Sequence, residues 1–188
     1  MDVKYINPFI LSTKKVFAQM VNVDLRVGQP FIKPKKVEMH RLYSLSAAID
    51  LSGPVIGKIV LSMSEPVTLA IASGLLCETV KAIGEDCYDA IAEVTNMIAG
   101  GAKKEIASHE PICLSIPKVM PTRCITCPEQ MPTLVIPFDT AMGRLVLQVS
   151  MIVLKRPDPA PDPKPHDPTP KPHPEAPAQP EPPSSKAA

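Results

Sequence analysis

The chain contains no tryptophan and only three tyrosines and four phenylalanines among its 188 residues. So few aromatic rings exclude the stacking platform on which single-stranded nucleic acids bind. The formal net charge is +1, which also argues against the basic surface that a phosphate backbone requires. We therefore expect no nucleic-acid partner.

Long hydrophobic runs are missing as well. The longest, residues 145–154, is shorter than the roughly 20 residues that a membrane-spanning helix needs. The first 15 residues carry an acidic side chain at Asp2 and lack the apolar core of a secretory signal. We therefore expect no membrane association and a cytoplasmic location, in which the five cysteines would be reduced thiols.

Proline, in contrast, is concentrated at the C-terminal end, where residues 156–188 hold 13 of the 24 prolines. Such a segment cannot bury a core and is expected to stay extended, largely as polyproline II. We interpret it as a solvated spacer, with a short ligand for a proline-binding partner as the alternative. Residues 1–155 are long enough to form one domain with its own core.

Hydrophobic periodicity within residues 1–155 predicts helices, and turn residues delimit strands. The predicted fold class is α/β (α+β), a largely antiparallel sheet with long helices packed on it. Residues 23–38 are expected to form a connection or an irregular edge strand. The predicted helices span residues 3–21, 65–78 and 85–109, and the predicted strands span residues 42–51, 55–63, 112–116, 134–138 and 143–154.

Two parts of the chain resemble each other. Residues 57–64, GKIVLSMS, match residues 143–150, GRLVLQVS, position by position in residue class. Residues 12–21 of the first predicted helix align in the same way with residues 89–98. We infer that the domain consists of two related, pseudo-symmetric halves.

The predicted helix at residues 85–109 carries an unusual line of residues opposite its apolar side. Asp89, Glu93, Asn96 and Gly100 follow one another at steps of four, three and four, which places them on one line along a helix. A solvated outer face is the commonest reason for such a line. Asparagine and glycine, however, both lower helix stability, so we interpret the line as a candidate site.

The aligned helix of the first half lacks this line. Val16 and Gln19 stand there in the places of Glu93 and Asn96. A site built on these two residues would therefore be present only in the second half.

The order Asp89, three residues, Glu93, two residues, Asn96 continues with Met-Ile-Ala-Gly and reaches Lys103. This sequence resembles the signature of the CheC, CheX and FliY family of bacterial chemotaxis phosphatases. The resemblance extends over most of residues 1–154. A single intact copy is typical of the CheX type, since CheC is expected to carry two.

The family signature also includes a proline, which follows the asparagine after 22 intervening residues. Pro117 follows Asn96 after 20 residues and Pro121 follows it after 24. Neither spacing matches the signature, and we assign the role to Pro117 with Pro121 as the alternative.

The resemblance implies hydrolysis of the phospho-aspartate on a CheY-like response regulator. The regulator would supply the acyl phosphate, a bound Mg²⁺ and a lysine, so the protein would need no cofactor or metal of its own. Asn96 would orient the attacking water, and Glu93 would pair with the lysine of the regulator. The other predicted partner-binding residues are Asp89, Gly100, Lys103 and Pro117.

A hypothesis from a different class is a non-catalytic binding module that docks on a response regulator or on the flagellar switch. The intact Glu93 and Asn96 favour the enzyme over this adaptor. The resemblance also implies a homodimer made by joining sheets, and the apolar final strands would suit such an edge pairing.

Cys124 and Cys127 form a lone C-x-x-C pair. A structural zinc site needs four ligands, and although Cys113 and His109 are candidates, a second cysteine pair is missing. We interpret the pair as incidental thiols. The chain also lacks the phosphate-binding motifs G-x-x-x-x-G-K-(S/T) and G-x-G-x-x-G, so we expect no bound nucleotide.

Deleting residues 157–188 is predicted to leave the implied phosphatase activity intact, because this segment can contribute neither a core nor a defined surface. The measurement is phosphate release from a phosphorylated response regulator by the full chain and by the truncated chain. A large loss on truncation would show instead that the proline-rich segment takes part in docking.

Overall fold

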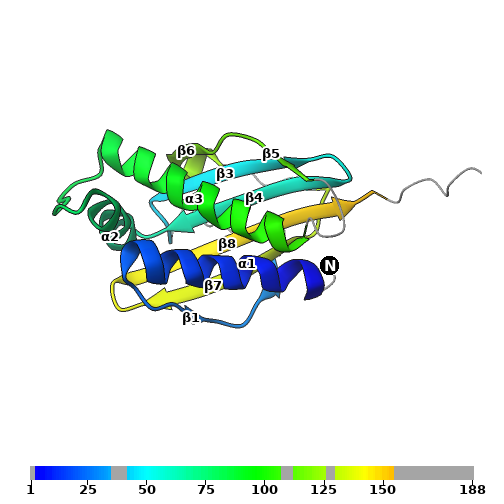
Figure 1. The fold of residues 1–188 in the computed structure, drawn as a ribbon, viewed down its shortest axis with the longest axis horizontal. Coiled ribbons are helices and arrows are strands. Elements are labelled where there is room, and N and C mark those ends of the chain that lie inside the picture. The colour runs from blue at the N-terminus through cyan, green and yellow to red at the C-terminus, as the bar shows by residue number, and fades with distance from the viewer. Residues whose placement is uncertain (1–2, 35–41, 107–111, 126–129, 155–188) are drawn as a thin grey trace, which may run out of the picture. The chain divides into compact units, whose positions relative to one another are not determined.

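The computed structural model describes residues 3–34, 42–106, 112–125 and 130–154. These residues form three helices packed on one sheet (Figure 1), which confirms the predicted fold class. The helices are α1 (Val3–Val16), continued by a π-helical turn (Phe17–Val21), α2 (Glu65–Leu76) and α3 (Glu85–Ile106). The strands are β1 (Arg26–Val27), β2 (Phe31–Ile32), β3 (Leu45–Ser52), β4 (Val55–Met63), β5 (Cys113–Leu114), β6 (Lys118–Pro121), β7 (Thr133–Thr140) and β8 (Gly143–Val153).

The strand order in the sheet is β1-β7-β8-β4-β3-β5, with β2 also paired to β7 and β6 also paired to β3. Every pairing is antiparallel. Of the two alternatives for residues 23–38, a connection or an irregular edge strand, the described residues 23–34 show the second, as the short strands β1 and β2. The sequence did not predict β6, because Pro117 before it and Pro121 at its end suggested only short extended pieces.

The final strands do not lie at an edge of the sheet, so the expected edge pairing through them is wrong. Strand β8 lies in the centre, paired to β4 from Val55–Val153 to Met63–Leu145. Strand β7 is flanked by β8 and by β1 and β2. The apolar run of β8 reflects burial of both faces of a central strand. A homodimer itself stays a prediction.

Helices α1 and α3 lie side by side in opposite directions on one face of the sheet, and α2 lies at the end of α1, beside the first turns of α3 (Figure 1). The core lies between this helical layer and the sheet. The hydroxyl of Ser12 in α1 donates a hydrogen bond of 2.8 Å to the carbonyl of Ile98 in α3. A Cβ on Gly101 would overlap the Ser12 hydroxyl, so Gly101 allows the two helices to approach closely. Of the described helices, none combines the length and apolarity needed to cross a bilayer.

The opposite face of the sheet carries buried hydroxyl groups that bond to one another. Ser46 of β3 bonds to Ser62 of β4 at 2.7 Å and to Thr122 at 2.8 Å. Thr133 of β7 bonds to Ser150 of β8 at 2.7 Å. The β3–β4 and β7–β8 hairpins therefore each contain one pair of hydrogen-bonded hydroxyls across their two strands.

Two pseudo-symmetric halves are evident in the pairing of the strands. The short strands of each half pair with the hairpin of the other half: β1 and β2 with β7, and β5 and β6 with β3. Gly28 donates its backbone N–H to the carbonyl of Pro137 at 2.9 Å, as Ser115 does to Asp50 at 3.0 Å. The halves are thus related across the central β4–β8 pair.

The predicted alignment of the strands, however, is displaced by two residues. It equated Gly57 with Gly143, but Gly57 lies inside β4, whereas Gly143 follows the β7–β8 turn with φ of +150°. The hydroxyl pairs instead make Ser62 the counterpart of Ser150. A shift of two residues keeps every side chain on the same face of a strand, so a comparison of residue classes cannot detect it.

The predicted alignment of the helices is also wrong. Val16 is 6% exposed and belongs to the core, whereas Glu93 is exposed. The buried and exposed positions of α1 agree with those of α3 when Thr13 is matched with Thr95. Both threonine hydroxyls are buried and donate a 2.7 Å hydrogen bond to the carbonyl one turn earlier.

In this register the counterparts of Glu93 and Asn96 are Leu11 and Lys14, and not Val16 and Gln19 as the sequence alignment predicted. Both Leu11 and Lys14 are exposed. The first half therefore still lacks the glutamate and the asparagine, as the sequence predicted.

The two glycines Gly57 and Gly100 are predicted to respond to alanine in opposite directions. A Cβ on Gly57 would overlap the backbone of Ser150 and Met151 in β8, so Gly57→Ala should lower the free energy of unfolding by about 3 kcal/mol. No atom lies within 4 Å of a Cβ built on Gly100, so Gly100→Ala should raise it by about 0.5–1 kcal/mol. Urea unfolding measures both, and equal midpoints for Gly57→Ala and the parent would contradict the close β4–β8 contact.

Candidate functional site

A groove of about 440 Å³ lies between α3 and the segment that joins β5 to β6. We call residues 114–117, which are the last residue of β5 and the connection to β6, the β5–β6 strap. One wall comes from α3 and the other from the strap. The lining residues are Asp89, Ala92, Glu93 and Asn96 from α3, and Leu114, Ser115, Ile116 and Pro117 from the strap.

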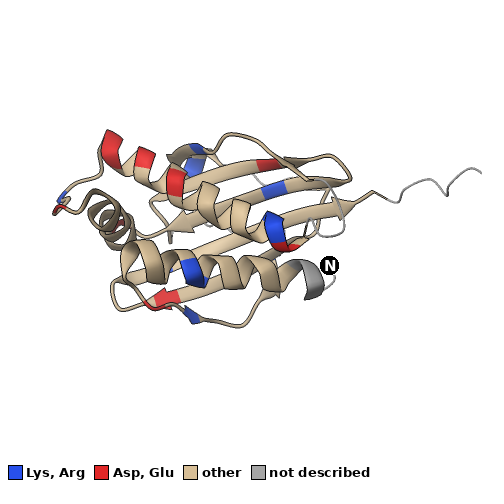
Figure 2. Cartoon of the chain, in the orientation of Figure 1, with Lys and Arg blue, Asp and Glu red and all other residues tan. Residues whose placement is uncertain are grey.

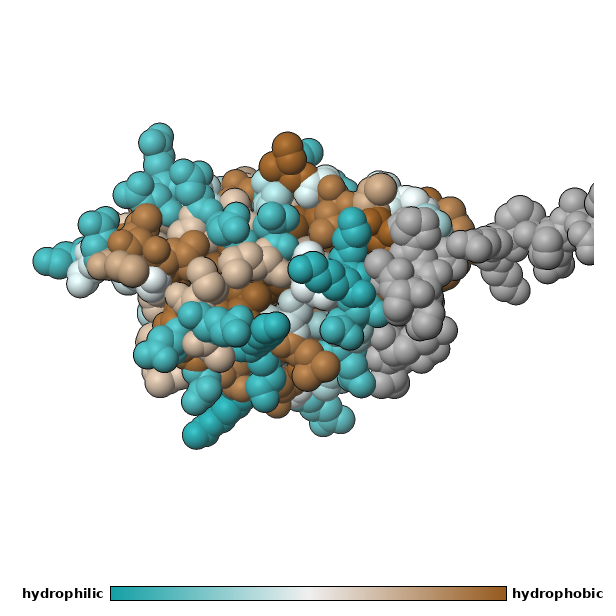
Figure 3. Space-filling model, in the orientation of Figure 1, coloured by the Kyte–Doolittle hydropathy of each residue, from teal (hydrophilic) through white to brown (hydrophobic). Residues whose placement is uncertain are grey.

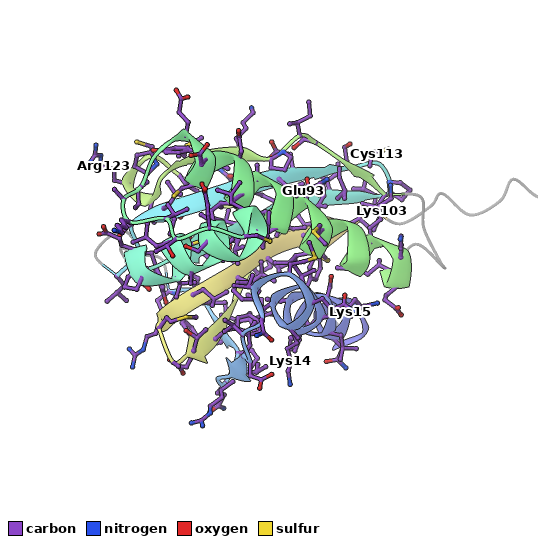
Figure 4. All side chains as sticks on the ribbon, turned by 60° about the vertical axis from the view of Figure 1, so that its left-hand side comes forward. Lys14, Lys15, Glu93, Lys103, Cys113 and Arg123 are labelled. Atoms are coloured by element: carbon purple, nitrogen blue, oxygen red, sulfur yellow. The ribbon has the colours of Figure 1, made fainter. Side chains whose placement is uncertain are left out.

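The groove contains most of the site predicted from sequence. Asp89, Glu93 and Asn96 are exposed along α3, on the side of the helix that does not face the core. Figure 4 shows Glu93 near the middle of α3. The three side chains share one wall of the groove because the steps of four and three residues bring them to one line on the helix.

The other predicted residues of α3 lie farther along the helix. Gly100 and Lys103 follow Asn96 by one and by about two turns, and neither is among the groove-lining residues. Gly100 leaves an open, flat surface, since nothing lies within 4 Å of its missing side chain. The neighbouring Gly101 instead serves the contact between α1 and α3.

The structure also distinguishes the two candidate prolines. Pro117 lines the groove, whereas Pro121 ends β6 and pairs with Leu45 of β3. The groove therefore contains Pro117, the residue assigned from the sequence.

Three strap residues that line the groove were missed: Leu114, Ser115 and Ile116. The sequence predicted a continuous strand over residues 112–116, but only Cys113 and Leu114 pair as β5. A strap crossing beside a helix has no period of its own, so only tertiary structure could place it. The one available signal was that Pro117, already part of the candidate site, ends this stretch.

The groove is negatively charged. Two of its lining residues are carboxylates, Asp89 and Glu93, and none is basic. Figure 2 shows acidic residues along the first half of α3, with lysine at its far end. Such a surface attracts a cationic group from a partner. Within the described ranges, no three metal-ligating side chains lie together.

Neither Cys113 nor Cys124 lines the groove. Cys124 is exposed and free at the end of a 3-10 turn, Thr122–Cys124, and Cys113 is exposed and free in β5. Cys127 and His109 fall outside the described residues.

An amide and a carboxylate one turn apart define what the groove can do chemically. Asn96 can donate and accept a hydrogen bond at once, and Glu93 can accept from a cation. The described groove holds no serine or cysteine nucleophile with an adjacent histidine base. Its side chains are therefore suited to position a reaction whose other groups come from a partner.

Solved structures with the same fold define the class of protein. CheX from Desulfovibrio desulfuricans is 25% identical, with a TM-score of 0.71 over 79% of this chain and 99% of that one. A CheC-like superfamily protein from Shewanella sp. PV-4 is 26% identical, with a TM-score of 0.73 over 81% and 99%. A chain of the CheX–CheY–BeF3–Mg²⁺ complex from Borrelia burgdorferi shares the fold at 22% identity, with a TM-score of 0.65 over 78% and 97%. The structure is thus that of a CheC- and CheX-like chemotaxis protein.

The family model of the chemotaxis phosphatase CheX matches residues 45–139, half of the chain. The chain belongs to the CheX family. The matched residues include α3 and the β5–β6 strap, so they contain the whole groove. No curated protein matches the sequence.

Proposed function

We propose that the protein hydrolyses the phospho-aspartate of a CheY-like response regulator. The observation that carries this proposal is the groove, in which Glu93 and Asn96 face the strap with Pro117. The CheX family is a family of chemotaxis phosphatases, and a groove that positions a partner's reactive group fits that activity.

In the proposed reaction a water oxygen attacks the phosphorus of the regulator's acyl phosphate. The bond from phosphorus to the aspartate oxygen breaks, which releases inorganic phosphate and returns the aspartate of the regulator as a carboxylate. The protons of the water pass to the phosphate and to solvent. No covalent intermediate forms on this chain, so its residues need only orient the water and hold the partner.

Asn96 orients the water in this proposal. Its side chain is exposed on α3, so it can enter the active site of a docked partner. The amide oxygen accepts a hydrogen bond from the water while the amide nitrogen donates to a phosphoryl oxygen. These two contacts would place the water in line with the bond that breaks.

Glu93 fixes the docking register in this proposal. It lies one turn before Asn96 in the same groove, so a lysine paired to Glu93 would stand beside the reacting phosphoryl group. Asp89 adds negative charge to this wall of the groove. Gly100 and Lys103 would border the contact farther along α3, where the surface beside Gly100 is open.

The regulator supplies the remaining groups in this proposal, including Mg²⁺, so the protein carries no cofactor of its own. The CheX–CheY–BeF3–Mg²⁺ complex from Borrelia burgdorferi supports this arrangement, since a protein of the same fold was solved there together with CheY. The proposed partner of this chain is accordingly a CheY-like regulator.

A turnover measurement tests the proposal against the non-catalytic adaptor. Phosphate release is followed from a phosphorylated regulator in at least tenfold excess over the protein. An enzyme will dephosphorylate many equivalents of the regulator. An adaptor can only bind the phosphorylated regulator, at most one equivalent per binding site. Absence of turnover beyond the regulator's own rate would reject the phosphatase.

Asn96→Ala is predicted to lower the dephosphorylation rate on the order of 100-fold or more, because the water loses its orientation. The same variant should be slightly more stable, by about 0.5 kcal/mol, since alanine is the better helix former at an exposed position. Rate and urea midpoint are measured on the same preparation. A variant as fast as the parent would show that Asn96 is not the water-orienting residue.

Glu93→Lys is predicted to weaken binding of the regulator on the order of 10- to 100-fold, because a lysine would meet the partner's lysine. Glu85→Lys is the matched control: it makes the same charge change in α3 outside the groove. Titration with a beryllofluoride-loaded regulator measures both. Equal weakening by the two substitutions would indicate a general charge effect and contradict a specific pairing of Glu93.

A further inference from the structure

The β5–β6 strap has a counterpart in the other half, the segment that joins β1 to β2. The backbone N–H of Ser115 bonds to Asp50 of β3, and that of Gly28 bonds to Pro137 of β7. The residue two positions after each donor is a proline, Pro117 in one segment and Pro30 in the other. Residues that differ between the two segments are the ones that can serve a site present in only one half.

Ile116 is such a difference. Its counterpart in the β1–β2 segment is Gln29, which is also exposed. Ile116 is 85% exposed, more than any other large hydrophobic side chain of the described residues. Figure 3 shows a hydrophobic projection at the edge of the molecule over the β5–β6 region. The fold accepts a polar residue at this position, so burial in the core does not explain the isoleucine.

Ser115 is a second difference. Its hydroxyl accepts a 2.9 Å hydrogen bond from the backbone N–H of Asp50 and donates one of 3.2 Å to the carbonyl of Ile116. In the other half, the counterparts are Pro137, which has no N–H to satisfy, and Gly28, which has no hydroxyl. A Cβ on Gly28 would also lie 2.9 Å from the Pro137 ring. The additional hydrogen bonds therefore hold the backbone only where Ile116 follows.

We propose that Ile116 is an apolar docking residue for the response regulator and that Ser115 positions it. This inference rests on the proposed function. The groove presents carboxylates on its α3 wall and Ile116 on its strap wall. The partner surface that fits is a lysine beside an apolar patch, and the apolar contact would then supply affinity while the charges supply orientation.

Ile116→Gln tests the docking role, because it installs the residue type that the other half carries at the equivalent position. The dissociation constant for a beryllofluoride-loaded regulator should rise about tenfold, since an aliphatic side chain is no longer buried at the interface. In steady-state dephosphorylation, KM should rise more than kcat falls. Leu11→Gln, at another exposed aliphatic position with 63% exposure and outside the groove, is the matched control and should bind as the parent does.

Ser115→Ala tests the positioning role. It leaves the Asp50 N–H without its hydroxyl acceptor, so the strap should loosen and the dissociation constant should rise severalfold. Ser115→Thr keeps the hydroxyl and should restore binding. Failure of threonine to restore what alanine removes would overturn the positioning role.

Three outcomes overturn the docking role of Ile116. If Ile116→Gln binds the regulator as tightly as the parent while Asn96→Ala still loses catalysis, the docking inference fails and the proposed function stands. If Ile116→Gln lowers the free energy of unfolding as much as it lowers the free energy of binding, the residue supports the fold and not the partner. If the parent neither binds nor dephosphorylates the regulator, the proposed function fails, and this inference fails with it.

Discussion

The antiparallel pairing of β4 with β8 is the contact on which the rest of the structure depends. It joins the hairpins of the two halves into one sheet, and it requires Gly57, whose missing side chain lets the β8 backbone approach. Because the halves meet there, α1 and α3 lie side by side on one face (Figure 1). The short strands of each half then complete opposite edges of the sheet.

The two halves share a scaffold but not a surface. Buried features recur in both, such as the hydroxyl pairs of the hairpins and the back-bonded threonines of α1 and α3. The exposed positions differ, because no packing constraint fixes them. Glu93 and Asn96 on the helix and Ile116 on the strap all occur in the second half. This coincidence of differences around one groove indicates a site more strongly than any single residue does.

The proposed chemistry suits an open surface groove. Phosphoryl transfer depends on position and charge more than on covalent participation, so a carboxylate and an amide on one rigid helix can suffice. The helix is itself rigidly held, since Gly101 and Ser12 bring α1 into close contact with α3. The strap is held independently through Ser115 and Asp50. The two walls of the groove therefore belong to two separately fixed elements.

The sequence alone determined the features that have a local period. The three helices, the β3–β4 and β7–β8 hairpins and the line of Asp89, Glu93 and Asn96 follow from spacing within single elements, and the structure agrees. Only the tertiary structure decided the features that depend on which segments meet. These are the central place of β8, the register of the repeat, the burial of Val16 and the strap with Ser115 and Ile116. A shift by two residues in a strand preserves the pattern of faces, and the strap has no periodic pattern, so long-range packing had to decide both. The helix alignment differed by five residues, and only the burial of Val16 in the structure revealed the difference.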